Sequence, residues 1–131
     1  MKRLSLILAA LVCCLAALAS APDITFEATA HDFGTIREKD GAVKCTFTYT
    51  NSGTAPLALT TVSAPCGCTK PKFSPKPLAP GKKGTIEVTF VPEDISGEFM
   101  RTITVRTNIK QADGKKKKVT LKISGVVIPK K

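Results

Sequence analysis

The chain has 131 residues, a length that suits one domain, and its 20 Lys and Arg against 10 Asp and Glu give a formal net charge of +10. No aromatic residues are interleaved with the lysine runs, so the sequence lacks a platform for stacking on bases and we expect no nucleic-acid partner. After residue 19 no apolar pattern has a helical period, which excludes sites built from a Gly-rich loop and a helix.

The first 19 residues have the pattern of a signal peptide. A basic start at Lys2 and Arg3 precedes an apolar run, and Ala17-Leu18-Ala19 fits the small-residue rule for cleavage. The apolar run is too short for a comfortable membrane span. We therefore expect a cleaved signal peptide at 1–19 and a single domain at 20–131, with its core at about 24–127. The mature chain would have no transmembrane span and would lie in the periplasm or cell envelope, or be secreted.

Cys13 and Cys14 raise the alternative of a lipoprotein anchor. A lipobox needs a small residue directly before the cysteine, and neither Val12 nor Cys13 fits that position well, so we expect plain cleavage. Cleavage would leave 18 basic and 10 acidic residues, a net charge of +8. For an exported protein the anionic neighbours are lipid head groups, lipopolysaccharide or acidic glycans.

Short runs of alternating apolar and polar residues, separated by turn residues, predict β-strands along the rest of the chain. The first strand begins at Ile24 and continues through His31 to Ile36, with Gly34 at a bulge or kink. A bulge is also expected near Val62, which is out of register in its strand. The other strands are predicted at 42–51, 57–64, 85–91, 98–108 and 119–127, with an edge strand or loop in the proline-rich stretch 69–80.

This spacing predicts an all-β, seven-stranded immunoglobulin-like sandwich. The sequence contains no Trp, so it lacks the Cys…Trp…Cys core of antibody domains. The core must therefore consist of packed aliphatic side chains and six Phe.

Three motifs occur in a fixed order along these predicted strands. They are His31-Asp32-Phe33-Gly34, then Asn51-x-Gly53 followed by Pro56-Leu57, then Cys66-Gly67-Cys68-Thr69 followed by Pro80-Gly81. With them the chain resembles, over about residues 25–127, a bacterial domain-of-unknown-function family of small exported Ig-like domains. That family is akin to PapD-like chaperones and major sperm protein, which are binding modules. The resemblance implies a PapD/MSP-like sandwich that holds a partner by strand addition or loop contacts.

The Cys66-Gly67-Cys68 corner is the strongest candidate site, since two thiols one residue apart suit a disulfide or a soft metal. Strands of alternating direction place Cys45, Cys66, Cys68 and Met100 at one pole of the sandwich, with His31 nearer the other. Cys45 could bond Cys66 or Cys68 and close a loop of some twenty residues, which would contribute roughly 3 kcal/mol. Alternatively, Cys66 bonds Cys68 in a small, easily reduced ring.

A third alternative is a Cu(I) site formed by Cys66, Cys68 and the Met100 thioether; zinc would need a fourth ligand. The structural interpretation is that both cysteines fill the pole as small apolar side chains. His31 stands alone beside Asp32, and the acids are scattered, so we expect no catalytic site.

Lys115, Lys116, Lys117 and Lys118 form a basic run before the last strand. Lysines at an exposed edge prevent edge-to-edge aggregation, and the functional alternative is contact with an anionic surface. The sequence as a whole favours a non-catalytic, exported binding or assembly module without a cofactor. The alternative is a copper-binding or thiol-redox protein that uses the cysteine corner.

Overall fold

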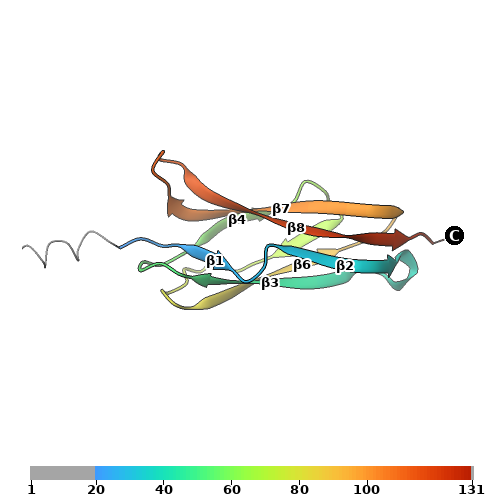
Figure 1. Ribbon diagram of the computed structural model, residues 1–131, viewed down its shortest axis with the longest axis horizontal. Helices are drawn as coiled ribbons and strands as arrows, with labels where there is room; N and C mark the ends of the chain where they lie inside the picture. Colours follow the sequence, from blue (N-terminus) through green and yellow to red (C-terminus); the bar gives the residue numbers. More distant parts are fainter. Residues whose placement is uncertain (1–19, 131) are drawn as a thin grey trace, which may run out of the picture.

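The alternating segments form β-strands that stack in two layers (Figure 1). The computed structural model describes residues 20–130, so the predicted signal peptide, with Cys13 and Cys14, lies outside the described residues. One sheet has the order β1-β3-β6-β5 and the other β2-β8-β7-β4. The strands are β1 (Ile24–Phe26), β2 (Ala30–Arg37), β3 (Val43–Asn51), β4 (Leu59–Ser63), β5 (Thr69–Lys72), β6 (Lys83–Phe90), β7 (Gly97–Lys110) and β8 (Lys116–Ile128). This arrangement confirms the predicted all-β, immunoglobulin-like sandwich.

The first predicted strand is divided between the two sheets. β1 pairs antiparallel with β3, whereas β2 pairs parallel with β8, so the described sandwich has eight strands where the sequence predicted seven. The register of β2 shifts between Asp32 and Thr35, which confirms the bulge expected at Gly34. Gly34 has a φ of +70°, a conformation that costs little only for glycine, and its N–H donates to Asp32 Oδ1 over 2.8 Å.

The core lies between the sheets and is made by alternate residues of the long central strands. Phe90 and Phe99 stack within this core, with their ring centroids 4.1 Å apart. The bulge expected near Val62 occurs in β4 as a register shift between Leu59 and Thr61. Leu57 is buried but precedes β4, bridging Leu78 instead. The buried apolar residues are Ile24, Cys45, Phe47, Tyr49, Leu57, Leu59, Ile86, Val88, Phe90, Phe99, Ile103, Val105, Ile109, Leu121, Ile123 and Val127.

The proline-rich stretch starts with β5, an edge strand that pairs only with β6 among the described strands. An edge position tolerates Pro71, which has no N–H to donate to a second neighbour. The short 3-10 helix η1 (Glu38–Asp40) joins β2 to β3. Within residues 20–130 no helix is long and apolar enough to cross a membrane.

Candidate functional site: the disulfide pole

The cysteine corner lies at one end of the sandwich, which we call the disulfide pole. Val43 at the start of β3 and Thr69 at the start of β5 both pair with Phe90 at the end of β6, and β7 begins nearby at Gly97. His31 does not lie at the opposite pole, because its partner on β8 is Ile123, and Ile123 pairs in turn with Arg101 on β7. The parallel pairing of β2 with β8 therefore holds His31 level with Arg101, in the half of the sandwich that contains the disulfide pole.

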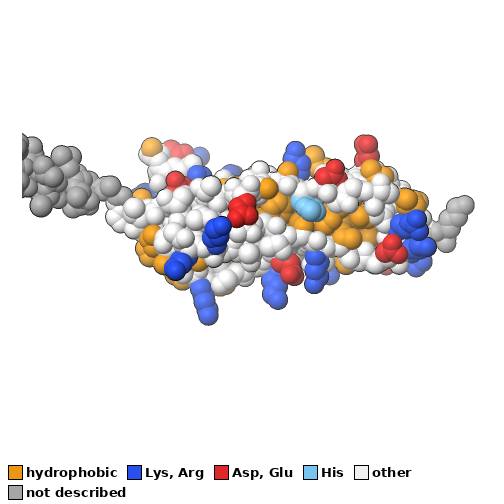
Figure 2. All heavy atoms as spheres, turned by 60° about the horizontal axis from the view of Figure 1, so that its bottom comes forward, with side chains coloured by type: hydrophobic (Ala, Val, Ile, Leu, Met, Phe, Trp, Pro, Cys, Tyr) orange, Lys and Arg blue, Asp and Glu red, His pale blue; other side chains and the backbone are white. Residues whose placement is uncertain are grey.

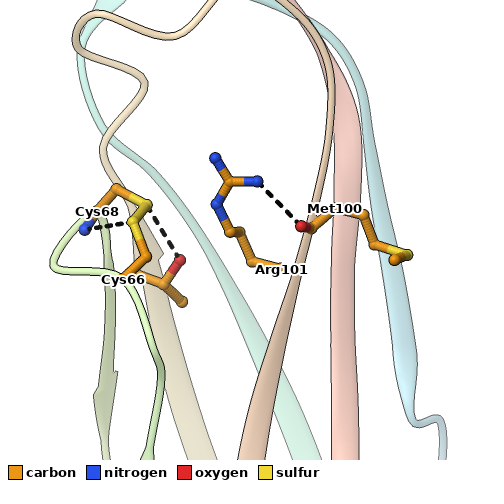
Figure 3. Close-up of a disulfide and its surroundings, with 5 residues drawn as sticks. Cys66, Cys68, Met100 and Arg101 are labelled. Atoms are coloured by element: carbon orange, nitrogen blue, oxygen red, sulfur yellow. Dashed lines mark hydrogen bonds between the residues drawn. A yellow bond between two sulfur atoms is a disulfide. The ribbon is translucent and has the colours of Figure 1, made fainter.

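The structure joins Cys66 to Cys68 through a disulfide, with the two Cα atoms 5.2 Å apart. The turn is held by backbone groups: the Thr69 N–H donates to the Cys66 carbonyl over 3.2 Å, and the Val91 N–H donates to the Cys68 carbonyl over 2.8 Å. Gly67 is exposed at the tip, whereas Thr69 is only 3% exposed and ties the turn to the core. The corner is therefore a half-buried disulfide on a fixed turn (Figure 3).

Cys45 is a free thiol in the structure and is 8% exposed. It lies on β3 opposite Val88, inside the core. Burial raises the pKa of its thiol to about 11, because the apolar surroundings disfavour the charged thiolate. Of the pairings that the sequence left open, the structure contains Cys66–Cys68 and leaves Cys45 as a packed, protonated side chain.

Met100 lies at the same pole but on the opposite side of β7. Figure 3 shows its side chain directed away from the disulfide, while Arg101 lies on the disulfide's side. The alternation along β7 is the cause, because Phe99 and Arg101 share one face and Met100 the other. With the two sulfurs bonded to each other and Met100 turned away, this arrangement does not fit the Cu(I) site considered from the sequence.

An open hollow of about 430 Å³ lies beside the corner and is lined by Gly67, Cys68, Lys70, Val91, Glu93 and Asp94. Cys68 is the disulfide cysteine that borders this hollow. In the part of the chain that the structure describes, no three His, Cys, Asp or Glu side chains are grouped as metal ligands.

The remaining predicted site residues lie away from the corner. Lys115 to Lys118 lie where β7 turns into β8, at the far end of the sandwich, and Lys117 pairs with Asp23 over 3.5 Å. The ring of His31 packs edge-on against Phe33, with centroids 4.6 Å apart. The structure thus brings Cys66 and Cys68 together and keeps Cys45, Met100, His31 and the lysine run apart from them.

One feature that sequence reasoning missed is an open side of the sandwich between β2 and β3. β1 covers β3 only at residues 49–51, and beyond them the Glu27 N–H donates to the Thr48 carbonyl. Between Val43 and Phe47 no described strand pairs with this edge of β3. Apolar side chains gather along this side (Figure 2), and Phe33, Ile36 and Val43 pack only partly against the core. The sequence signal that could have predicted this open side is the shortness of the alternating run before His31, which is too short to cover the whole of β3.

Solved structures with similar folds support this architecture. The ASH / PapD-like domain 7 of human CEP192 is 12% identical, with a TM-score of 0.67 over 85% of this chain and 89% of that one. A protein of unknown function from Porphyromonas gingivalis is 18% identical, with a TM-score of 0.68 over 82% of this chain and 48% of that one. The periplasmic chaperone SfaE is 13% identical, with a TM-score of 0.51 over 83% of this chain and 59% of that one.

At these identities the likenesses establish a common fold. This chain spans about half the length of the Porphyromonas gingivalis protein and somewhat more of the chaperone. No curated protein matches the sequence. One family matches nearly the whole sandwich, over residues 24–127, and the chain therefore belongs to the family described as "Protein of unknown function (DUF1573)".

Proposed function

We propose that this protein is an exported, non-catalytic binding or assembly module of the bacterial cell envelope, and that it holds an extended segment of a partner protein along the open edge of β3. The observation that carries the proposal is the unpaired backbone between Val43 and Phe47, next to the partly buried Phe33 and Ile36. A free strand edge offers a row of N–H and C=O groups, and alternate apolar side chains of an added strand would fill the gap between the sheets.

The similarity of the fold to that of a periplasmic chaperone supports this proposal. The sandwich is similar to that of SfaE, which is a periplasmic chaperone. The predicted signal peptide would deliver this chain to the same side of the inner membrane.

Site-specific photocrosslinking in the native cell tests the proposal. A photoreactive residue at Thr46, exposed on the open part of β3, is expected to capture one defined extended segment, whereas the same residue at Thr61 on β4 is expected to capture none. Val43→Lys places a charge beside the edge and should abolish capture at Thr46. The matched Val62→Lys, a half-buried valine on the edge strand β4, should leave it intact. Equal capture from both edges would contradict the proposal.

A second candidate function is thiol–disulfide exchange at Cys66–Cys68. It is favoured because this disulfide is half-buried and borders an open hollow, and accessible disulfides are the ones that exchange. A partner thiolate would attack one sulfur, form a mixed disulfide and release the other cysteine as a thiolate. A second partner thiol would complete the reaction, leaving the partner oxidised and both cysteines reduced.

Equilibration with glutathione at a series of reduced-to-oxidised ratios tests this exchange. The Cys66–Cys68 bond should open within the range of those buffers, as alkylation and mass spectrometry would record. A bond that stays closed in fully reduced glutathione would rule out this candidate without affecting the binding proposal.

A further inference from the structure

Three large apolar side chains are exposed among the described residues, and all three lie towards the disulfide pole. Met100, Val126 and Ile128 are 57%, 38% and 47% exposed. Val126 and Ile128 are two residues apart on β8 and so share its outer face, while Leu121, Ile123 and Val127 face the core. Met100 pairs with Ser124 and is therefore a diagonal neighbour of Val126. The three form an apolar stripe on the outer face of the β2-β8-β7-β4 sheet, and the exposed Glu98 borders it opposite Val126.

The stripe leads into a basic pocket at the same pole. This pocket has a volume of about 450 Å³ and is lined by Arg37, Lys39, Ile128, Pro129 and Lys130. Basic side chains are visible beside the C-terminal end in Figure 2. The ion pairs of residues 20–130 use Lys44, Lys83 and Lys117, so none of the three pocket cations is neutralised by one.

The nearest acid is already engaged. The Glu38 carboxylate accepts the backbone N–H groups of Lys130 and Asp94, each over 2.8 Å, and so ties both the C-terminal segment and the loop between β6 and β7 to η1. No acidic residue lines the pocket itself. Arg37 and Lys39 in particular remain free to receive an anion that comes from outside.

We propose that this pole docks on an anionic phospholipid surface, with Arg37, Lys39 and Lys130 receiving headgroup phosphates. Met100, Val126 and Ile128 enter the boundary between head groups and acyl chains. Cations attract the anionic surface, and exposed apolar side chains beside them gain from insertion at the same depth. Three cations that take part in no ion pair, next to the exposed apolar stripe, meet both requirements, whereas a soluble anion would need only the pocket. The contact uses the outer face of one sheet and is separate from the open edge of β3.

The lysine run at the other end of the sandwich provides a matched comparison. Lys115, Lys116 and Lys118 are exposed, but the exposed large apolar side chains of residues 20–130 all lie elsewhere. The lysine run can attract an anionic surface at a distance, but it has no neighbouring exposed apolar side chains that could insert into that surface. Removing three charges at either end changes the net charge equally, so a difference between the ends reports the location of the contact.

Cosedimentation with vesicles tests the proposal, using protein purified after export, with its N-terminus verified by mass spectrometry. The vesicles contain phosphatidylglycerol and phosphatidylcholine, with pure phosphatidylcholine as the neutral control. Arg37→Gln/Lys39→Gln/Lys130→Gln should weaken binding about a hundredfold, since each cation near the surface contributes roughly a fivefold factor. Lys115→Gln/Lys116→Gln/Lys118→Gln should weaken it by no more than about fivefold. Met100→Ser/Val126→Ser/Ile128→Ser should also release the protein, and more so at high salt.

Several outcomes would overturn the proposal. Equal losses from the two triple-charge variants would show attraction by net charge alone. Unchanged binding of the serine variant would show that the stripe does not insert. Displacement by millimolar inorganic phosphate would show a pocket for a soluble anion, and absence of binding by the wild type would remove the site altogether. Because every substituted side chain lies at the surface or rim, thermal unfolding midpoints close to the wild-type value are expected and serve as the folding control.

Discussion

At the residue scale, Asn51 shows why a motif can be structural. Its side chain is fully buried, and its amide donates to the carbonyls of Ala55 and Leu78 over 2.8 and 2.9 Å. Its Oδ1 accepts the Gly53 N–H over 3.0 Å. A Cβ on Gly53 would collide with the backbone of Pro22 and Asp23. Asn51-x-Gly53 thus satisfies buried carbonyls and lets two backbone segments approach, which gives the motif a structural role.

Glu38 provides a prediction about pH. The backbone N–H groups of Lys130 and Asp94 and the charge of Lys130 lower the pKa of this carboxyl below 4.5, because they stabilise its charged form. The stabilisation is therefore fully present above pH 4.5 and is lost as the pH falls through the lower, folded-state pKa. We expect Glu38→Gln to lower the thermal unfolding midpoint at pH 7, and we expect this difference to shrink below pH 4.5.

Thermal scans of both proteins between about pH 7 and pH 3 would check this prediction, since carboxyl groups titrate across that range. Glu98→Gln is the control, because it removes an exposed carboxylate that accepts no hydrogen bond within residues 20–130. A difference between wild type and Glu38→Gln that widens on acidification would contradict the prediction.

At the element scale, the parallel pairing of β2 with β8 depends on Gly125. A Cβ at this position would lie 2.8 Å from the Gly34 carbonyl oxygen and 2.8 Å from the Phe99 ring. The Gly34 oxygen belongs to the bulge of β2, and Phe99 is stacked on Phe90. The same glycine therefore permits both the bulge of the edge strand and the aromatic packing below it.

We expect Gly125→Ala to lower the free energy of unfolding by about 1 to 3 kcal/mol, the usual cost of overpacking a well-filled site. Ser124→Ala, one residue away and facing outward, should change it by less than about 0.5 kcal/mol. Urea unfolding would measure both. A Gly125→Ala protein as stable as the wild type would show that β2 moves away freely, and that the bulge is not fixed by β8.

The elements also show what the sequence could and could not predict. Alternation alone was sufficient for β3, β6, β7 and β8, because each has one buried and one exposed face. It could not show that the first strand divides, because both halves alternate in the same way and the change of partner is a tertiary event. The alternation along β7 places Phe99 inside the sandwich and Met100 outside it. The prediction that grouped Met100 with the cysteines considered only the pole at which they lie and not the face of the strand. Cysteine spacing left three pairings open, since their choice depends on the turn.

At the scale of the whole molecule, the core determines stability and the disulfide adds little. A crosslink stabilises by limiting the unfolded chain, so a loop of three residues contributes about 1.5 kcal/mol, half of what a twenty-residue loop would give. The buried apolar residues of both sheets pack without help from this bond, and Cys45 belongs to them. The disulfide therefore lies at one end of a sandwich whose fold does not depend on it.

We expect the reduced protein to remain folded, with its free energy of unfolding lower by about 1.5 kcal/mol. Urea unfolding with and without reductant would measure the loss, and Cys66→Ser/Cys68→Ser should reproduce it. In the chain that begins at Ser20, thiol reagents should find no reactive cysteine in the oxidised native state, because burial holds the Cys45 pKa at about 11. They should find one cysteine after unfolding alone, two after reduction of the folded protein, and three after reduction and unfolding together. Collapse of the fold on reduction would mean that the corner, and not the apolar core, holds the two sheets together.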